Sequence, residues 1–304
     1  PNDNVCDGTP VQDAIAAATA GDTLVLAAGT YSDTLTVDKE LIIDCSDNSD
    51  RILTGAVTVS GDDVTFDSCT FNNTISGAGD TVTFNSDSGN GNRNIFNNTI
   101  TLSGDTVKID NNTLNANATV TLSGATATFT NNSTVTEAAI FSGTNPTITG
   151  NTFTAGVTLS GANSNNANNI QNNTFNSTIS IQESGHQFTT VENNFEGTIT
   201  ITADGDNTTI ALGDFNTTTP LTVNSGATGL NISQSDFAEA VTIAGASATL
   251  NNNTINDTVT MSGATATFTN NSTVTGAAVF SGTNPTITGN TFTAGVTLSG
   301  ANSN

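Results

Sequence analysis

Short apolar–polar–apolar triplets recur along most of the chain, and each is followed by a pair of small turn residues. Examples are VTVSG at 57–61, VTLSG at 120–124 and VTIAG at 241–245. Alternate residues of a strand point to opposite faces, so we expect the outer two residues of each triplet to lie inside and the middle one outside. The triplets return about every 20 residues. Such a period predicts a solenoid, in which each coil buries its apolar face against its neighbours.

A much longer repeat contains these short ones. The segment 119–165 returns almost unchanged as 258–304, and only three of its 47 positions differ: Leu122 becomes Met261, Glu137 becomes Gly276 and Ile140 becomes Val279. The offset of 139 residues spans seven short units. A duplication of whole coils lengthens a solenoid without turning its inward residues outward, so this repeat favours a protein selected for reach.

The first fifty residues differ from the rest and predict a helical cap. Thr9 and Pro10 precede VQDAIAAATAG, which is typical of a short helix that ends at Gly21. Its apolar residues fall on one face at helical spacing: Val11, Ala14, Ile15 and Ala18. We therefore expect residues 1–53 to form the N-terminal cap helix and first coils, and residues 54–304 to form the repeat coils.

A second apolar strand follows each turn, and an Asn recurs three residues after its last apolar position. An Asn at one bend of every coil can hydrogen-bond to the next Asn along the axis and satisfy polar groups that water cannot reach. The Phe residues that often follow are expected to stack inside. The predicted ladder comprises Asn112, Asn132, Asn151, Asn173, Asn194, Asn253, Asn271 and Asn290.

The middle residues of the triplets predict an exterior column of threonines. Its members are Thr58, Thr101, Thr121, Thr158, Thr200, Thr222, Thr242, Thr260 and Thr297. Ile140 and Val279 interrupt this column. The neighbouring column, which a flat ice-binding face would also need, is broken by alanine and glycine. Thr is a favoured residue on exposed strands, which explains the column more simply.

Three cysteines lie near the N-terminus. Cys69 falls at the place that later coils give to the ladder Asn, so we expect it to be a small buried group. The bridge that we expect joins Cys6 to Cys45 and would fasten the cap to the solenoid in an oxidising compartment. A Cys45–Cys69 bridge spans about one coil and stays open as an alternative, as do free thiols.

The chain resembles the right-handed parallel β-helix, or pectin-lyase-like, superfamily. The opening VQDAIAAATAGDTLVLAAGTYSDTLTVDKELIIDC is similar to the capping helix and first coils of that superfamily, and TITGNTFT and FTNNST are similar to its coils with an asparagine ladder. The resemblance implies an all-β, right-handed, single-stranded parallel β-helix with a short N-terminal capping helix. It implies little about function, because the fold hosts lyases, hydrolases, adhesins and structural fibres.

Charge excludes some classes of partner. The net charge is −23, with 27 acidic residues against four basic ones: Lys39, Arg51, Arg93 and Lys108. Four scattered cations cannot form a basic patch, so we expect neither nucleic-acid binding nor attraction to an anionic membrane. No apolar run approaches the roughly 18 residues of a membrane span, so direct membrane insertion is not expected either.

Candidate catalytic residues are few. Lyases of the resembled superfamily need a basic residue near carboxylates that hold calcium. Arg93, with Asp87 nearby, is the best candidate, but it has no second base and is more simply an exposed loop residue. His186, in ESGHQF with Glu183, is expected to be a solvated turn residue. We therefore predict no catalytic residues, no metal, no cofactor and no enzymatic activity.

The sequence as a whole favours a structural or adhesive extracellular protein. It would form a rigid rod on a cell surface or a filament by end-to-end stacking, with self-association or surface carbohydrate as its partner. The alternatives are a polysaccharide-active, lyase-like enzyme, or a module that binds ice or carbohydrate through the Thr face. The sequence ends one strand into a new coil, so we expect either a longer chain or a neighbouring subunit over that coil.

Overall fold

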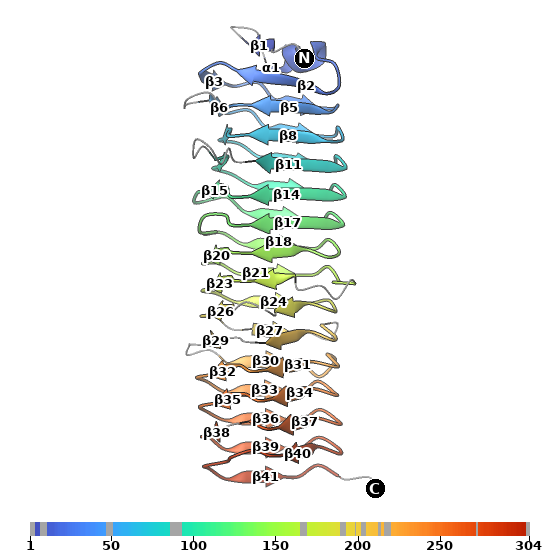
Figure 1. The fold of residues 1–304 in the computed structure, drawn as a ribbon, viewed down its shortest axis with the longest axis vertical. Coiled ribbons are helices and arrows are strands. Elements are labelled where there is room, and N and C mark those ends of the chain that lie inside the picture. Colours follow the sequence, from blue (N-terminus) through green and yellow to red (C-terminus); the bar gives the residue numbers. More distant parts are fainter. Residues whose placement is uncertain are drawn as a thin grey trace. The chain divides into compact units, whose positions relative to one another are not determined.

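The structure is a computed structural model, and it describes residues 4–6, 11–46, 51–85, 93–164, 169–188, 193–197, 199–201, 205–211, 214–215, 220–271 and 273–301. These residues form an all-β parallel solenoid of about 13 turns, with about 19 residues in each turn. They group into two compact units, Pro1–Thr147 (unit 1) and Ile148–Asn304 (unit 2). Within each unit, strands of successive coils pair in parallel (Figure 1). The predicted fold class is thereby confirmed.

The coils of unit 1 build three parallel sheets, which we name I, II and III in the order in which a coil visits them. Sheet I holds β4 (Leu35–Val37), β7 (Val57–Val59), β10 (Ile75–Gly77), β13 (Ile100–Leu102), β16 (Val120–Leu122) and β18 (Ala139–Phe141). Sheet II holds β1 (Asn4–Cys6), β2 (Asp22–Leu26), β5 (Leu41–Asp44), β8 (Val64–Asp67), β11 (Thr81–Asn85), β14 (Thr106–Asp110) and β17 (Thr126–Thr130). Sheet III holds β3 (Gly29–Tyr31), β6 (Arg51–Leu53), β9 (Thr70–Phe71), β12 (Ile95–Phe96) and β15 (Thr113–Leu114).

The coils of unit 2 repeat this plan. Sheet I holds β21 (Val157–Leu159), β24 (Ile179–Ile181), β27 (Ile199–Ile201), β30 (Leu221–Val223), β33 (Val241–Ile243), β36 (Val259–Met261), β39 (Ala278–Phe280) and β41 (Val296–Leu298). In the position of sheet II, β19 (Thr147–Thr149) pairs with β22 (Ile170–Gln171), and a separately hydrogen-bonded set follows: β25 (Gln187–Phe188), β28 (Thr209–Ala211), β31 (Asn231–Ser233), β34 (Thr249–Asn251), β37 (Thr267–Thr269) and β40 (Thr286–Thr288). Sheet III holds β20 (Thr152–Phe153), β23 (Thr174–Phe175), β26 (Asn194–Phe195), β29 (Asp214–Phe215), β32 (Asp236–Phe237), β35 (Thr254–Ile255) and β38 (Thr273–Val274).

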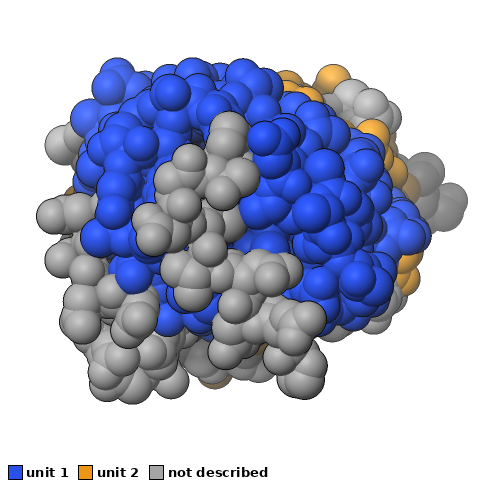
Figure 2. Space-filling view, turned by 90° about the horizontal axis from the view of Figure 1, so that it is seen from above, with its two compact units in different colours: residues 1–147 blue, residues 148–304 orange. Residues whose placement is uncertain are grey.

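A helix covers the first coil of unit 1. This helix, α1 (Val11–Ala17), buries Val11 and Ile15 and packs against strands β1, β2 and β4. The ammonium group of Lys39 donates to the carbonyls of Ala16 and Ala18 at 3.3 and 3.1 Å, so it satisfies acceptors at the end of the helix. Figure 2 shows the described residues of unit 1 from this end, where their atoms pack against one another. The predicted capping helix is therefore present.

Phenylalanine rings fill the inside of the coils. In unit 2 the inward residue of sheet III is a stacked Phe in successive coils, with ring centroids 4.2 to 5.6 Å apart. The stacked rings belong to Phe153, Phe175, Phe195, Phe215 and Phe237. Phe66 stacks on Phe84 in the same manner in unit 1, at 5.3 Å. Parallel pairing brings equivalent residues of neighbouring coils together, so one Phe per coil produces a continuous apolar column.

The bend between sheets II and III has a fixed backbone form. The residue before the inward bend position has a positive φ, of 50 to 60° at its non-glycine members. These members are Ser68, Asn111, Asn131, Asn172, Gln234, Asn252 and Asn270. Asn tolerates this left-handed conformation better than most residues, and its side chain faces outward here. The second residue of each Asn–Asn pair therefore turns into the interior.

A column of glycines marks the turn between sheets I and II. A β-carbon on Gly124 would lie 1.7 Å from the carbonyl oxygen of Gly104, and one on Gly143 would lie 1.6 Å from that of Gly124. Gly263 and Gly282 repeat this approach in unit 2, at 1.8 and 1.9 Å. The backbone of one coil thus occupies the space of a side chain in the next. This steric requirement explains the glycine that closes each SG or AG pair of the repeat.

Candidate functional site

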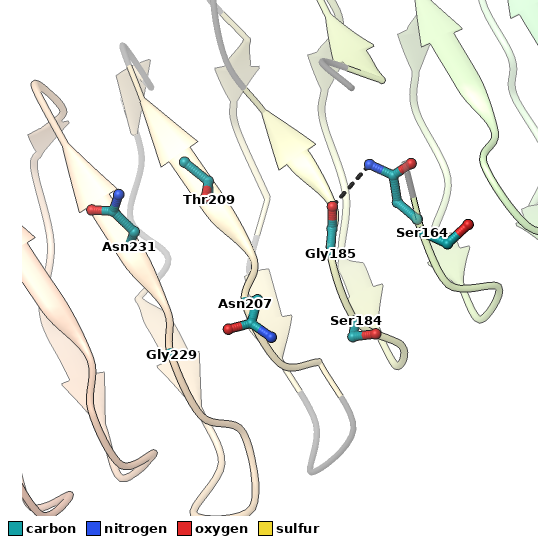
Figure 3. A pocket seen from close by; sticks show the side chains of 8 residues that line it. Ser164, Ser184, Gly185, Asn207, Thr209, Gly229 and Asn231 are labelled. Atoms are coloured by element: carbon teal, nitrogen blue, oxygen red, sulfur yellow. Dashed lines mark hydrogen bonds between the residues drawn. The ribbon is translucent and has the colours of Figure 1, made fainter. Parts of the chain in front are cut away.

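A hollow on unit 2 lies where four successive coils pass from sheet I to sheet II. We name it the polar groove, and its volume is about 560 Å³ (Figure 3). It is lined by Asn163, Ser164, Ser184, Gly185, Asn207, Thr209, Gly229 and Asn231. Every lining side chain is neutral, and those beyond glycine end in an amide or a hydroxyl group. The groove therefore offers hydrogen-bond donors and acceptors without a formal charge.

Two glycines open the floor of the polar groove. Gly185 and Gly229 have φ of 81° and 69°, and Asn207 between them has φ of 53°. A β-carbon on Gly185 would lie 2.2 Å from the carbonyl oxygen of Asn163, and one on Gly229 would lie 2.5 Å from the side-chain oxygen of Asn207. Space therefore requires glycine at position 185, where the obstacle is backbone, and positive φ favours glycine at both positions. Along this column, a coil with an amide side chain alternates with a coil that has a glycine and therefore no side chain.

A buried polar chain supports one end of the groove. The side-chain nitrogen of Asn163 donates to the carbonyl of Gly185 at 2.8 Å and to the side-chain oxygen of Asn169 at 3.3 Å. The side-chain nitrogen of Asn169 lies 3.2 Å from Nδ1 of His186. All three side chains are buried. The hydrogen bonds therefore run from the groove wall into the interior of the coil.

His186 is the inner end of this chain, and the expectation of a solvated turn residue was wrong. Parallel register places it in one inward column with Thr208, Leu230 and Ala248. Burial lowers the pKa of His186 from 6.5 to about 4, although the carbonyl of Gly161 partly offsets this. The ring is therefore neutral at neutral pH. No other described group meets hydrogen-bonding geometry at Nε2.

The asparagine ladder lies inside the bend between sheets II and III. Asn151 donates to the side-chain oxygen of Asn173 from its backbone nitrogen at 3.0 Å and from its side-chain nitrogen at 3.2 Å. Asn253 and Asn271 repeat this arrangement at 2.9 and 3.1 Å. In unit 1, Asn112 donates to the side-chain oxygen of Asn132 at 3.0 Å. Each buried amide is thus satisfied by the neighbouring coils.

One ladder position was predicted wrongly and others were missed. Asn193, not Asn194, accepts the hydrogen bonds of Asn173, while Asn194 lies half-buried in β26. Sequence counting from the preceding apolar residue failed here, whereas counting back two residues from Phe195 gives Asn193. The same rule also gives two members that the prediction omitted. These are Asn94, which donates to Asn112 at 3.0 Å, and Ser235, which donates to Asn253 at 3.0 Å.

The disulfide joins Cys45 to Cys69, so the expected Cys6–Cys45 bridge was wrong. The two bonded cysteines lie in adjacent coils, 24 residues apart in sequence, with their Cα atoms 5.0 Å apart. Cys69 occupies the ladder column, and its backbone nitrogen donates to the side-chain oxygen of Asn94 at 2.8 Å. The bridge therefore continues the ladder towards the N-terminus and fastens two coils, not the cap. Cys6 lies in β1, in register with Leu26.

The predicted Thr residues lie in the outward register of sheet I. In unit 1, Thr58, Thr101 and Thr121 fall in one column, with Ser76 between the first two. In unit 2 the column holds Thr158, Thr200, Thr222, Thr242, Thr260 and Thr297, with Ser180 and Val279 among them. The prediction missed Thr36, which pairs with Thr58.

Three of the four basic residues have structural partners. Lys39 binds the end of α1, as described above. Arg51 is buried and donates from Nε to the carbonyl of Leu26 and from Nη1 to the carbonyl of Cys45, the latter at 3.2 Å. Lys108 lies 4.0 Å from the carboxylate of Asp110. Arg93 is exposed, and Asp87 lies outside the described residues.

The described residues contain no cluster of three or more His, Cys, Asp or Glu side chains that could hold a metal ion. The described part of the chain also has no helix of the length and apolarity that crossing a membrane requires. No protein-family model, curated protein or solved structure matches the sequence. The class that the fold defines is therefore the parallel β-solenoid. Its likeness to the pectin-lyase-like superfamily rests on the sequence motifs alone.

Proposed function

We propose that the protein is a structural or adhesive scaffold of an extracellular or cell-surface setting. The observation that carries this proposal is the equivalence of the two near-identical segments in the structure. Strands β16 and β18 of the first segment pair with Val120 opposite Ala139, and β36 and β39 of the second pair with Val259 opposite Ala278. The same sequence therefore makes the same coils in both units.

The differences between the two segments support selection for length. Leu122 and Met261 are both buried in sheet I, where Leu and Met have similar volumes. Ile140 and Val279 both occupy the outward column, where packing constrains the residue little. The two segments thus keep the same ladder residues and differ in the core only by an exchange of similar volume. Adding whole coils makes the molecule longer. Greater length is useful to a scaffold, whereas an enzyme with a single active site gains nothing from it.

One further observation supports an extracellular setting. The Cys45–Cys69 disulfide fastens adjacent coils, and such bonds persist mainly in oxidising compartments. The net charge of −23 opposes non-specific association between copies. An adhesive role would use the exposed surfaces of the coils, with surface carbohydrate as the proposed partner. Nucleic acid and anionic membranes are unsuitable partners for so acidic a chain.

Self-association is a second form of this proposal. In a filament or surface array, parallel strand pairing of the kind that joins successive coils would continue from one copy to the next.

A length series tests the scaffold. The short variant lacks residues 120–258, and the long variant carries residues 120–258 twice, so both junctions join equivalent positions of the repeat. We expect both to fold cooperatively and to differ from the native particle by seven coils, roughly 34 Å in electron micrographs. Duplication of residues 120–248 alone, which ends within a coil, is the control and is expected to misfold. Failure of the short and long variants to fold would refute the scaffold.

The enzyme alternative is tested directly. The full chain is incubated with polygalacturonate and with neutral glucans, and released reducing ends and unsaturated products are measured. The scaffold predicts that product release equals that of a heat-unfolded sample. Sustained release above this background by the native chain, lost on unfolding, would overturn the scaffold in favour of a lyase or hydrolase.

A further inference from the structure

The strongest unassigned feature is the regular spacing of groups along the polar groove. Asn163, Gly185, Asn207 and Gly229 follow one another in a single column, because the backbone nitrogen of each donates to the next coil. The acceptors are the carbonyls of Ser184, Asp206, Thr228 and Ala246, at 2.8 to 3.0 Å. Along this column the exposed amide of Asn207 lies two coils from the buried amide of Asn163, about 9.5 Å at ordinary strand spacing. The intervening glycine leaves room between them.

The groove keeps this form at a cost to the core. His186, Asn169 and Asn163 form a buried polar chain, although later coils place Leu230 and Ala248 in the inward column of His186. Burying polar groups is unfavourable unless hydrogen bonds compensate, so an apolar residue at position 186 would pack more simply. This buried polar chain instead holds the side-chain amide of Asn163 against the carbonyl of Gly185. A fixed polar side chain in the wall of a hollow is typical of a preorganised binding site.

The chemistry of the lining defines the ligand class. Amide and hydroxyl groups both donate and accept hydrogen bonds, as the hydroxyl groups of a sugar do. The lining carries no cation that would recognise a carboxylate, sulfate or phosphate, and the net charge of −23 repels polyanions. The length of the groove over four coils suits an extended chain of linked units better than one small molecule.

We propose that the polar groove binds an uncharged oligosaccharide that lies along the stacked coils, with Asn207 and Asn231 contacting its hydroxyl groups. The proposal rests on the adhesive form of the proposed function and gives that function a ligand class and a place. Asn207 and Asn231 lie in adjacent coils, so they would contact an extended glycan that follows the coil axis. The polar groove is separate from the Thr column, which lies on the outward face of sheet I.

The test uses the full chain and immobilised cellotetraose, mannotetraose and tetragalacturonate as probes. We expect binding to at least one neutral probe and little to the acidic one. Asn207→Gly removes the amide while keeping a residue suited to positive φ, and Asn231→Ala removes the second amide. Each is expected to weaken binding about five- to tenfold, the loss of one hydrogen bond. Asn284→Gly is the matched control, since Asn284 has φ of 52° at the same turn outside the groove.

Three outcomes would overturn the assignment. These are no binding of either neutral probe, equal or stronger binding of tetragalacturonate, and unchanged neutral binding in both groove variants. The short variant without residues 120–258 lacks the groove and separates the two proposals. If it folds and no longer binds, both stand. If it folds and still binds, the groove assignment fails but the adhesive scaffold does not, whereas its failure to fold counts against the scaffold.

Discussion

The side-chain oxygen of Asn271 accepts a hydrogen bond of 2.9 Å from the backbone nitrogen of Asn253, its counterpart in the preceding coil. The side-chain nitrogen of Asn271 donates in turn to the carbonyl of Leu250 at 3.3 Å and to the side-chain oxygen of Asn290 at 2.9 Å. One buried amide thus links three coils. Asn271 is fully buried, so removing its side chain would leave these groups without their partner.

Asn271→Ala is therefore expected to lower the free energy of unfolding by about 3 kcal/mol, because it leaves several buried donors and acceptors unsatisfied. Urea unfolding followed by circular dichroism measures the loss. The control is Asn256→Ala, because Asn256 is exposed and follows directly after β35. This substitution should change the free energy of unfolding by less than about 0.5 kcal/mol. Equal effects of the two substitutions would argue against the ladder as a source of stability.

Gly124→Ala tests the glycine column. Its β-carbon would lie 1.7 Å from the carbonyl oxygen of Gly104, so the backbone of two coils must separate. We expect a loss of more than about 4 kcal/mol, or no folded protein at all. Gly156→Ala meets its nearest atom at 3.7 Å and should be tolerated. Thermal unfolding of both variants compares them, and a stable Gly124→Ala protein would contradict the close approach.

Replacement of Cys45 and Cys69 by serine tests the disulfide. Closing a loop of 24 residues in the unfolded chain is worth roughly 3 kcal/mol, so the double variant should unfold at a lower temperature. Adding a reductant should destabilise the native chain by a similar amount and leave the double variant unchanged. Cys6→Ser should have little effect in either condition. Peptide mapping without reduction that linked Cys6 to Cys45 would contradict the pairing.

His186 predicts a specific dependence of stability on pH. Its pKa is about 4 in the folded protein and near 6.5 when unfolded, so below pH 6.5 the unfolded chain binds the extra proton. The free energy of unfolding should therefore fall from pH 6.5 to about 4, by an amount on the order of 3 kcal/mol, and then level off as far as this group is concerned. A His186→Leu variant, measured over the same range, should lack this component. Parallel curves for the two proteins would exclude His186 as the cause.

The regular part of the structure follows from the sequence because each coil repeats the same physical solution. A triplet such as Val57–Val59 gives its inward and outward residues by period two, and a recurring Phe gives the stacked column. The ladder failed only where the count began at the wrong landmark, as at Asn194. Phe195 was the better landmark, since the bend has a fixed length before its strand.

The irregular features depended on three-dimensional packing that periodicity does not encode. Both disulfide pairings were open from sequence, and only the register of adjacent coils brings Cys45 to Cys69. His186 looked like a turn residue because Gly185 precedes it, yet it lies directly before β25 and continues the inward register of that strand. The polar groove needed knowledge of which turns stack, because Gly185 and Asn207 are 22 residues apart in sequence but adjacent in the column.

The left-handed bend residue accounts for sequence triplets that would otherwise suggest N-linked glycosylation of a secreted protein. Asn111, Asn172 and Asn252 occupy that bend, the next Asn enters the ladder, and Thr113, Thr174 and Thr254 begin the following strand. These three structural requirements together spell Asn–Asn–Thr, which is also the acceptor triplet for N-linked glycans. Acceptor triplets at this bend therefore follow from the fold, and their presence alone is no evidence of glycosylation.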